Sequence, residues 1–313
     1  MPAEGPRVAL ITGATSGIGE AAAAALHRRG WCVLVHGRTV EKATDAVARI
    51  EVTAAVDPGH APDDAAFNTS HSPSSTGTLI PVGCDLSSLG SVRAFASDIA
   101  ASYPSLDAVV NNAGVFTSTR QLSADGYELQ FAVNHLAGYC LTRLLLPALA
   151  ASGNGRVVMV SSGSHRGGRI HLRNPGLEGL YLGFSAYAQS KLANILFMRE
   201  LQRRSEAGRI DAFAFEPGLV NTEMGEKGTG GLVALVWSRR KHHGVTPEEG
   251  ASTGVLLVTD AGLAGKGGTY WANRALANPS RRATDGQTAV RLWDLSARMC
   301  GLPEELDLGS AQP

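Results

Sequence analysis

The sequence predicts an α/β fold in which a doubly wound parallel sheet carries helices on both faces, giving three layers in a single domain over residues 1–313. Three observations support this prediction. Short apolar runs alternate with helical patterns, the first run leads through a glycine-rich turn into a helix, and no repeat or second domain boundary interrupts the order. With 44% apolar residues, the chain can bury the core of one large domain.

Strands are expected where short aliphatic runs lie between turn residues, at 8–12, 31–36, 78–84, 106–111, 156–161 and 210–216. Helices are expected where apolar residues recur at helical spacing, at 17–29, 40–50, 89–103, 126–151 and 184–205. Two stretches break the alternation. Residues 57–77 are rich in Pro, Ser, Asp, His and Gly, and we expect a mobile surface insertion there. Residues 219–245 follow the sixth strand, and we expect them to form a lid over a ligand.

Charge and composition exclude several classes of protein. The chain has 28 basic and 28 acidic residues, whereas nucleic-acid binding needs a basic surface, so no nucleic-acid partner is expected. No apolar run reaches the ~18 residues of a membrane span, and the N-terminus lacks the regions of a signal peptide. We therefore expect no transmembrane segment and a cytoplasmic location. The four cysteines show no zinc-ligand spacing, so no metal site is expected; they are Cys32, Cys84, Cys140 and Cys300.

The glycine-rich turn lies between the first strand and the first helix. Glycines there allow a tight turn and the close approach of a pyrophosphate, which meets the free N–H groups and positive end of the helix. This context favours a dinucleotide site of the Rossmann type over a purely structural turn, which remains the alternative. The candidate cofactor-binding residues are Gly13, Thr15, Ser16, Gly17, Ile18 and Gly19.

The end of the second expected strand predicts which dinucleotide binds. A carboxylate at this point holds the ribose 2′-hydroxyl of NAD, whereas an arginine accommodates the 2′-phosphate of NADP. Here Arg38 follows His36-Gly37 and no carboxylate is present. Arg38 therefore predicts NADP(H), with an ordinary surface arginine as the alternative.

Tyr187 and Lys191 lie four residues apart, on one face of an expected helix. A nearby ammonium lowers the pKa of a phenol, which would make Tyr187 a usable acid or base. Ser161 and Ser162 end the fifth expected strand, at the edge of the sheet where ligands bind. Their hydroxyls could hold a substrate oxygen or cap the loop, and His165 is expected to be a loop residue.

With these residues assembled, the chain resembles the short-chain dehydrogenase/reductase superfamily over about residues 7 to 300. The resemblance implies a catalytic set of Asn134, Ser162, Tyr187 and Lys191. It also implies further cofactor contacts near the adenine, the ribose and the nicotinamide carboxamide, at Asp85, Leu86, Asn112, Ala113, Gly114, Pro217, Gly218, Val220 and Thr222.

A closer resemblance is to the retinol dehydrogenase and WW-domain oxidoreductase branch. It rests on Val133–Leu136, Leu141–Pro147, Ser190–Phe197, Thr246–Ala251 and Arg291–Ser296. This branch typically handles lipophilic alcohols, aldehydes and ketones. The insertion at 57–77 is longer than the branch usually carries, and neither a membrane anchor nor a WW domain is seen in the sequence.

The resemblance implies that a hydride moves between NADP(H) and the substrate carbonyl carbon, with Tyr187 as acid or base and Lys191 binding the nicotinamide ribose. Ser162 would hydrogen-bond the substrate oxygen, and Asn134 would position a water. Apolar residues of 163–184 and 219–245 would form the substrate wall, or else cover the core or a subunit interface. A homodimer through residues 126–151 and 184–205 is compatible with the superfamily. The alternative from another class is a catalytically silent, cofactor-binding regulatory or scaffold protein.

Overall fold

The computed structural model describes residues 5–56, 76–205, 209–218 and 245–308. The expected insertion at 57–77 and the expected lid at 219–245 therefore lie almost entirely outside the described residues.

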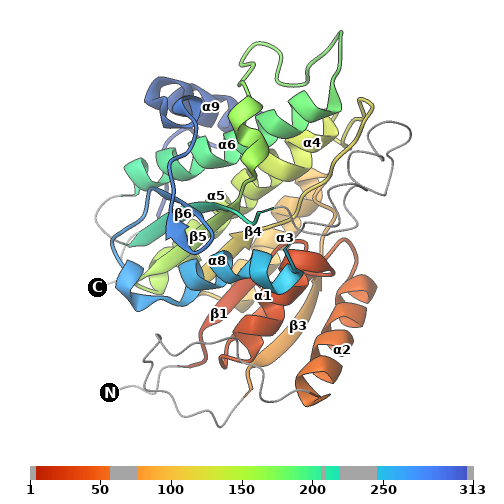
Figure 1. The fold of residues 1–313 in the computed structure, drawn as a ribbon, viewed down its shortest axis with the longest axis vertical. Coiled ribbons are helices and arrows are strands. Elements are labelled where there is room, and N and C mark those ends of the chain that lie inside the picture. Colours follow the sequence, from red (N-terminus) through yellow and green to blue (C-terminus); the bar gives the residue numbers. More distant parts are fainter. Residues whose placement is uncertain (1–4, 57–75, 206–208, 219–244, 309–313) are drawn as a thin grey trace.

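The described strands form one sheet in the order β3-β2-β1-β4-β5-β6-β7-β8 (Figure 1). Neighbouring strands from β3 to β7 pair in parallel, and β8 pairs antiparallel with β7. The order departs from β1 in both directions, so the sheet is doubly wound with its switch point between β1 and β4. The strand bounds are β1 Val8–Ile11, β2 Cys32–Gly37, β3 Thr78–Gly83, β4 Ala108–Asn111, β5 Gly155–Val160, β6 Ile210–Glu216, β7 Thr269–Ala272 and β8 Ala275–Leu276.

Helices cover both faces of the sheet (Figure 1), which confirms the three-layer α/β prediction. One hydrophobic cluster joins the sheet to α1 (Gly17–His27), α2 (Val40–Val56) and α8 (Pro247–Thr259). The other joins the opposite face to α3 (Leu89–Ser102), α5 (Ala137–Ala151), α6 (Gly183–Arg204) and α9 (Gly286–Met299). The short helical segments are α4 (Leu129–Phe131), η1 (Ala132–Leu136), η2 (Gly163–Gly167), η4 (Ala261–Leu263) and η5 (Arg281–Thr284).

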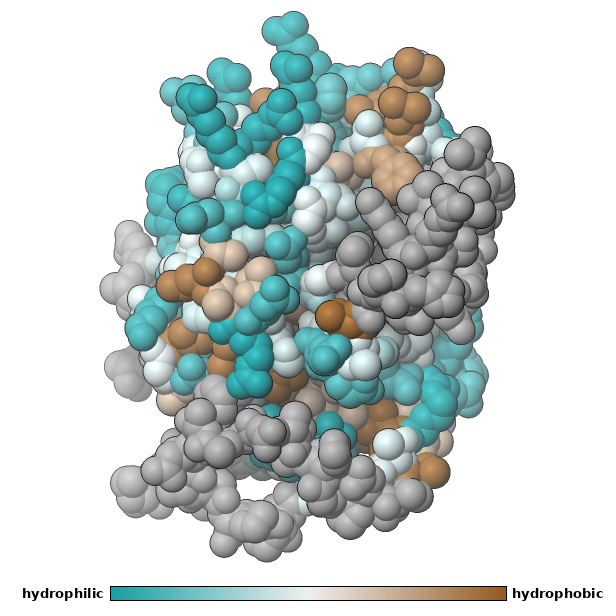
Figure 2. All heavy atoms as spheres, in the orientation of Figure 1, coloured by the Kyte–Doolittle hydropathy of each residue, from teal (hydrophilic) through white to brown (hydrophobic). Residues whose placement is uncertain are grey.

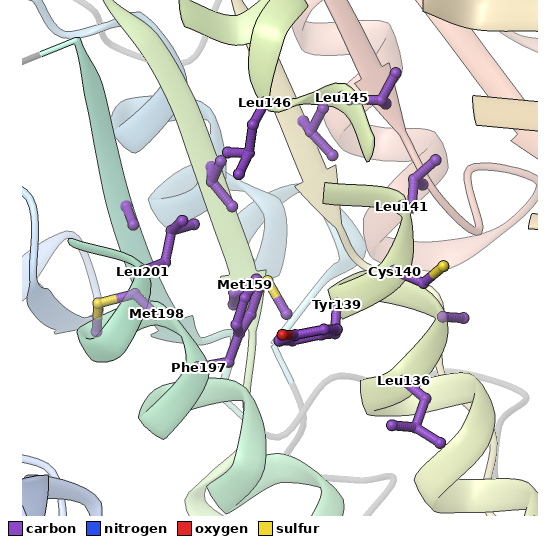
Figure 3. Close-up of a cluster of buried hydrophobic side chains, with 14 of the residues drawn as sticks. Leu136, Tyr139, Cys140, Leu141, Leu145, Leu146, Met159, Phe197, Met198 and Leu201 are labelled. Atoms are coloured by element: carbon purple, nitrogen blue, oxygen red, sulfur yellow. The ribbon is translucent and has the colours of Figure 1, made fainter. Parts of the chain in front are cut away.

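Within the second cluster, side chains of α5 and α6 meet those of β5. Figure 3 shows Tyr139 of α5 and Phe197 of α6 beside Met159 of β5, and the two ring centroids lie 5.0 Å apart. All three side chains are almost completely buried. This packing fixes the position of α6, the helix that carries Tyr187 and Lys191.

The prediction of a single helix at 126–151 was wrong in one respect, because the structure divides this stretch into successive helical segments. A π-helical turn, η1, separates α4 from α5, and Asn134 lies within it. The side chain of Asn134 exchanges hydrogen bonds with the main chain of Val115, which draws this turn toward the loop after β4. A π-turn at such a place is often associated with a functional site.

The C-terminal segment covers the outer side of α5 and α6. Two guanidinium groups lie over the ring of Trp293 in α9, that of Arg143 at 4.5 Å and that of Arg204 at 4.7 Å from the ring centroid. Arg143 also donates to the carbonyls of Pro303 and Glu305. The face on which a homodimer was expected is thus partly occupied by the chain itself, and the homodimer stays a prediction.

Among the described helices, none is both long and apolar enough to cross a membrane.

Trp293→Ala should lower the free energy of unfolding by about 3–5 kcal/mol, because it removes a fully buried side chain and the partner of two cations. Urea unfolding monitored by circular dichroism measures this change. Val52→Ala, on the exposed side of α2, is the control and should change it by less than about 0.5 kcal/mol. A loss below about 1 kcal/mol for Trp293→Ala would show that the C-terminal segment does not stabilise the fold.

Candidate active site

The site lies at the carboxyl edge of the sheet, where hydrogen bonds join the ends of β1 and β4. The Thr12 hydroxyl accepts from the amides of Asn112 and Ala113, both at 3.0 Å. In return the Asn112 side-chain amide donates to the carbonyls of Thr12 and Gly13, at 2.9 and 3.0 Å. The two strand ends are therefore fixed to each other at the switch point of the sheet, where ligands bind in such folds.

The glycine turn is as crowded as the sequence predicted. Gly13 has φ +62°, and a Cβ there would lie 2.8 Å from the Cα of Ala113. A Cβ on Gly19 would lie 2.3 Å from the carbonyl oxygen of Gly13. Helix α1 begins at Gly17, and the side chain of its N-cap residue, Ser16, accepts no capping hydrogen bond. The start of the helix thus lacks a side-chain cap, which suits the binding of an anionic group.

Arg38 is exposed just beyond β2, close enough to influence Asp85 beyond β3. Burial pushes the pKa of Asp85 upward, but hydrogen bonds from Ser87 and the charge of Arg38 outweigh it and leave that pKa below its usual range. Leu86 differs from the other expected cofactor residues, because its side chain packs in the core beneath the strand ends. Only its main chain is available for the cofactor.

Asn134 is buried, and both the oxygen and the nitrogen of its side-chain amide make hydrogen bonds. Its Oδ1 accepts from the Val115 amide at 2.7 Å, while Nδ2 donates to the Val115 carbonyl and to the Ser190 hydroxyl, both at 3.0 Å. Gly114 lies beside it, and a Cβ built on Gly114 would be 3.5 Å from Asn134 Oδ1 and 3.4 Å from Lys191 Nζ. The missing side chain at Gly114 leaves room directly in front of both groups.

Ser162 lies directly after β5 and is the N-cap of η2, with its hydroxyl accepting from the Ser164 amide at 3.2 Å. His165 is fully buried, and its Nδ1 lies 2.7 Å from the Ser162 carbonyl. Its Nε2 accepts from the Ser280 amide at 3.0 Å. His165 therefore holds the Ser162 loop to the C-terminal segment, a structural role in keeping with its prediction as a loop residue.

Tyr187 and Lys191 share one face of α6, as their spacing predicted, and Lys191 Nζ lies 5.6 Å from the centroid of the Tyr187 ring. Lys191 is 2% exposed, and its ammonium donates to the Val160 carbonyl at 3.1 Å. Burial lowers the pKa of Lys191 to about 8. A phenol, an ammonium and a serine hydroxyl are thus brought together, because Tyr187 also hydrogen-bonds Ser162.

The expected lowering of the Tyr187 pKa is not found. Burial raises the pKa of Tyr187 to about 12, and the hydrogen bond with Ser162 only opposes this rise. The physical reason is that burial opposes the charged phenolate, and that Lys191 is itself easier to deprotonate than usual.

Tyr181, the second tyrosine of this region, has partners of its own. Its hydroxyl donates to the buried carboxylate of Glu128 at 2.8 Å and accepts from Gln130 at 2.7 Å. These contacts fasten the segment before α6 to α4. The sequence pattern gave no sign of them, since the residues lie more than 50 positions apart.

Of the remaining predicted cofactor residues, Thr15 and Ile18 lie in the glycine turn and the start of α1, and Pro217 and Gly218 directly follow β6. Val220 and Thr222 lie outside the described residues. Within the described ranges, no group of three or more His, Cys, Asp or Glu side chains could hold a metal ion.

Lys191→Met should stabilise the protein at pH 7 by on the order of 2 kcal/mol, because it removes a buried cation while the Val160 carbonyl keeps Asn194 as a donor. Since folding lowers the pKa of Lys191 from 10.5 to about 8, the unfolded chain holds more protons between these values, and wild-type stability rises with pH there. The advantage of the variant should therefore shrink from pH 7 to pH 9.5.

Urea unfolding at several pH values measures both effects. Lys266→Met, at an exposed position, is the control and should show neither. A Lys191→Met protein less stable than wild type at pH 7, or a difference that does not vary with pH, would contradict the burial argument.

Comparison with known proteins agrees with this geometry. A family described as short chain dehydrogenase matches residues 7–58 and 60–230. Retinol dehydrogenase 14 of Homo sapiens is 37% identical over 306 residues, which cover 95% of this chain and 87% of that protein. Among solved structures, an uncharacterized protein from Mycobacterium paratuberculosis is similar with a TM-score of 0.71 and 30% identity, covering 96% of this chain and 95% of the other.

A second solved structure is described as an NAD(P)-dependent gluconate 5-dehydrogenase from Beutenbergia cavernae with bound NADP. It has a TM-score of 0.61 and 27% identity, covering 85% of this chain and 94% of the other. The glycine turn, the Asn134–Ser162–Tyr187–Lys191 group and these matches lead to one conclusion: the chain belongs to the short-chain dehydrogenase/reductase family, on its retinol dehydrogenase-like branch.

Proposed function

We propose that this oxidoreductase transfers a hydride between NADP(H) and a lipophilic alcohol, aldehyde or ketone. The observation that carries the proposal is the contact between Tyr187, Ser162 and the buried Lys191 at the same sheet edge as the glycine turn. A bound nicotinamide supplies or accepts the hydride, and the protein supplies position and the proton.

The residues present fit a dinucleotide. The glycine turn and the start of α1 would hold the pyrophosphate, while Asp85 and the main chain of Leu86 would border the adenine. The open space at Gly114, next to Lys191 and Asn134, suits the nicotinamide ribose. Arg38 supports the 2′-phosphate of NADP, because it is exposed at the end of β2 and no carboxylate occupies that strand end. The related structure with bound NADP is consistent with this choice.

Tyr187 is the proposed acid in the reducing direction. With a pKa near 12 its phenol is protonated at neutral pH, so it can donate a proton to the carbonyl oxygen of the substrate. The Ser162 hydroxyl, hydrogen-bonded to that phenol, would orient the same oxygen. Lys191 would stabilise the phenolate that remains, and Asn134, through the free lone pair of Oδ1, would hold a water that returns the proton.

A lipophilic substrate is supported by the side chains around Tyr187. The Phe116 ring lies 5.8 Å from the Tyr187 ring and 5.0 Å from that of Phe184, between ring centroids. Leu180 is 90% and Leu182 58% exposed, and Figure 2 shows a group of exposed apolar side chains at the upper end, where the segment before α6 lies. One relative of the chain is named a retinol dehydrogenase, and retinol is a lipophilic alcohol. The expected second wall, 219–245, lies almost wholly outside the described residues.

The cofactor assignment predicts that NADPH binds about tenfold or more tightly than NADH, and that Arg38→Ala removes this preference. Calorimetric titration of the full chain measures both affinities. Arg199→Ala, an exposed arginine of α6, is the matched control and should retain the preference. Equal binding of the two cofactors by wild type would show that Arg38 does not select the 2′-phosphate.

The acid assignment predicts that Tyr187→Phe slows reduction of apolar aldehydes and ketones by about 10²–10⁴-fold, while its NADPH affinity stays within about threefold. Tyr181→Phe should lose less than about tenfold, because its hydroxyl serves Glu128 and Gln130. NADPH oxidation followed at 25 °C over a panel of aldehydes, ketones and quinones gives the rates. If NADPH binds but neither wild type nor variant turns over any of them, the regulatory or scaffold alternative is favoured instead.

A further inference from the structure

His36 is a buried histidine at the edge of the cofactor site that the function above does not use. It is the second-last residue of β2 and is 2% exposed. The Gly13 amide donates to its Nδ1 at 3.1 Å, and its Nε2 lies 3.1 Å from the carbonyl oxygen of Cys84. One ring thus joins Gly13, the second residue after β1, to Cys84, the residue directly after β3.

The partners determine which nitrogen carries the proton. Because Nδ1 accepts from an amide and the Cys84 carbonyl can only accept, the ring is the neutral tautomer with hydrogen on Nε2. Burial lowers the pKa of His36 to about 4, which keeps the ring neutral at physiological pH. The Phe95 ring, 5.5 Å away between centroids, packs against it.

The main chain reinforces the same junction. The Ala14 amide donates to the His36 carbonyl at 2.8 Å, and the Cys84 amide donates to the Gly37 carbonyl at 3.0 Å. The ring adds what the main chain cannot, a direct connection across β2 between the glycine turn and the loop that holds Asp85. Without it, the half-buried amide of Gly13 and the buried carbonyl of Cys84 would lose their partners.

We propose that His36 is a positioning residue that sets the affinity for the dinucleotide by holding the turn at Gly13 and the loop at Cys84 in register. This inference rests on the proposed function, since it assumes that these two loops border the pyrophosphate and the adenosine. His36 is not among the groups proposed to take part in hydride or proton transfer. Its contribution is therefore to cofactor binding rather than to the rate of the chemical step.

Three variants separate the two hydrogen bonds. His36→Asn places an amide near the Nδ1 position and can still accept from Gly13. His36→Gln reaches the Nε2 position and can still donate to Cys84. His36→Leu can do neither. His27→Leu is the matched control, because His27 is also buried, at the far end of α1, and its Nδ1 has no hydrogen-bond partner.

Two readouts are measured on the full chain. Calorimetric titration gives the Kd of NADPH, and of adenosine 2′,5′-bisphosphate as a probe of the adenosine end alone. Amide hydrogen exchange of the protein without ligand reports protection at Gly13. Turnover at saturating NADPH gives kcat for comparison.

His36→Leu should weaken NADPH binding by about tenfold or more, with kcat within about twofold of wild type. The NADPH affinities of His36→Asn and His36→Gln should fall between those of wild type and His36→Leu. The Gly13 amide should be protected from exchange in the Asn variant but not in the Gln variant. His27→Leu should bind NADPH as wild type does.

The proposal is wrong if folded His36→Leu binds NADPH like wild type, or if it loses kcat with no change in Kd. Should His36→Leu not fold, equal Gly13 exchange in the Asn and Gln variants overturns it. Wild type that binds neither NADPH nor NADH contradicts the proposed function together with this inference. Wild type that binds NADH alone contradicts only the NADP preference, and the same variants are then compared with NADH.

Discussion

The junction of β1 and β4 is the constraint on which the rest of the site depends. β1 and β4 run parallel and end side by side at the switch point, from which the chain continues into opposite halves of the sheet. The exchange of hydrogen bonds between Thr12 and Asn112 fixes the two strand ends to each other. Gly13 can then turn tightly against Ala113, so that α1 begins at Gly17 with its first turn directed to the same edge. The proposed catalytic groups, from η1, from the loop after β5 and from α6, meet this edge from the other half of the sheet.

A second constraint is the placement of a half-buried tyrosine beside a buried lysine. The low-dielectric surroundings oppose charge on both, so the pKa of Lys191 falls to about 8 and that of Tyr187 rises to about 12. The protein tolerates this because the ammonium keeps the Val160 carbonyl as a partner and the phenol keeps Ser162. Such pairs are common at sites that move protons, and they are placed there at a cost in stability.

The sequence predicted those parts of the structure that local pattern determines. The six strands from Val8 to Glu216 are where the aliphatic runs lie, and the glycine turn, Tyr187 and Lys191 are at the predicted ends and faces. What it did not predict depends on contacts between distant residues. The π-turn at Asn134 follows from its bonds to Val115, and nothing in the helical pattern of 126–151 indicates it.

The C-terminal elements and His36 also depend on contacts that local sequence pattern does not reveal. The short β7 and β8, and helices α8 and α9, were not among the expected elements, although the sequence resemblance extended over them. His36 looked like an ordinary strand residue because its role lies in two backbone groups, at Gly13 and Cys84, that have no signature of their own. The raised pKa of Tyr187 likewise follows from burial, which spacing alone does not reveal.

The central claim is that this edge of the sheet brings together a nicotinamide, an apolar carbonyl compound and the Tyr187 acid. The most direct test is to supply NADPH deuterated at both C4 positions with an apolar aldehyde and to analyse the alcohol by mass spectrometry. The account predicts one deuterium on the carbinol carbon of the product, and at most about one hundredth as much labelled alcohol from Tyr187→Phe in the same time. Unlabelled alcohol, or cofactor oxidation without alcohol formation, would contradict it.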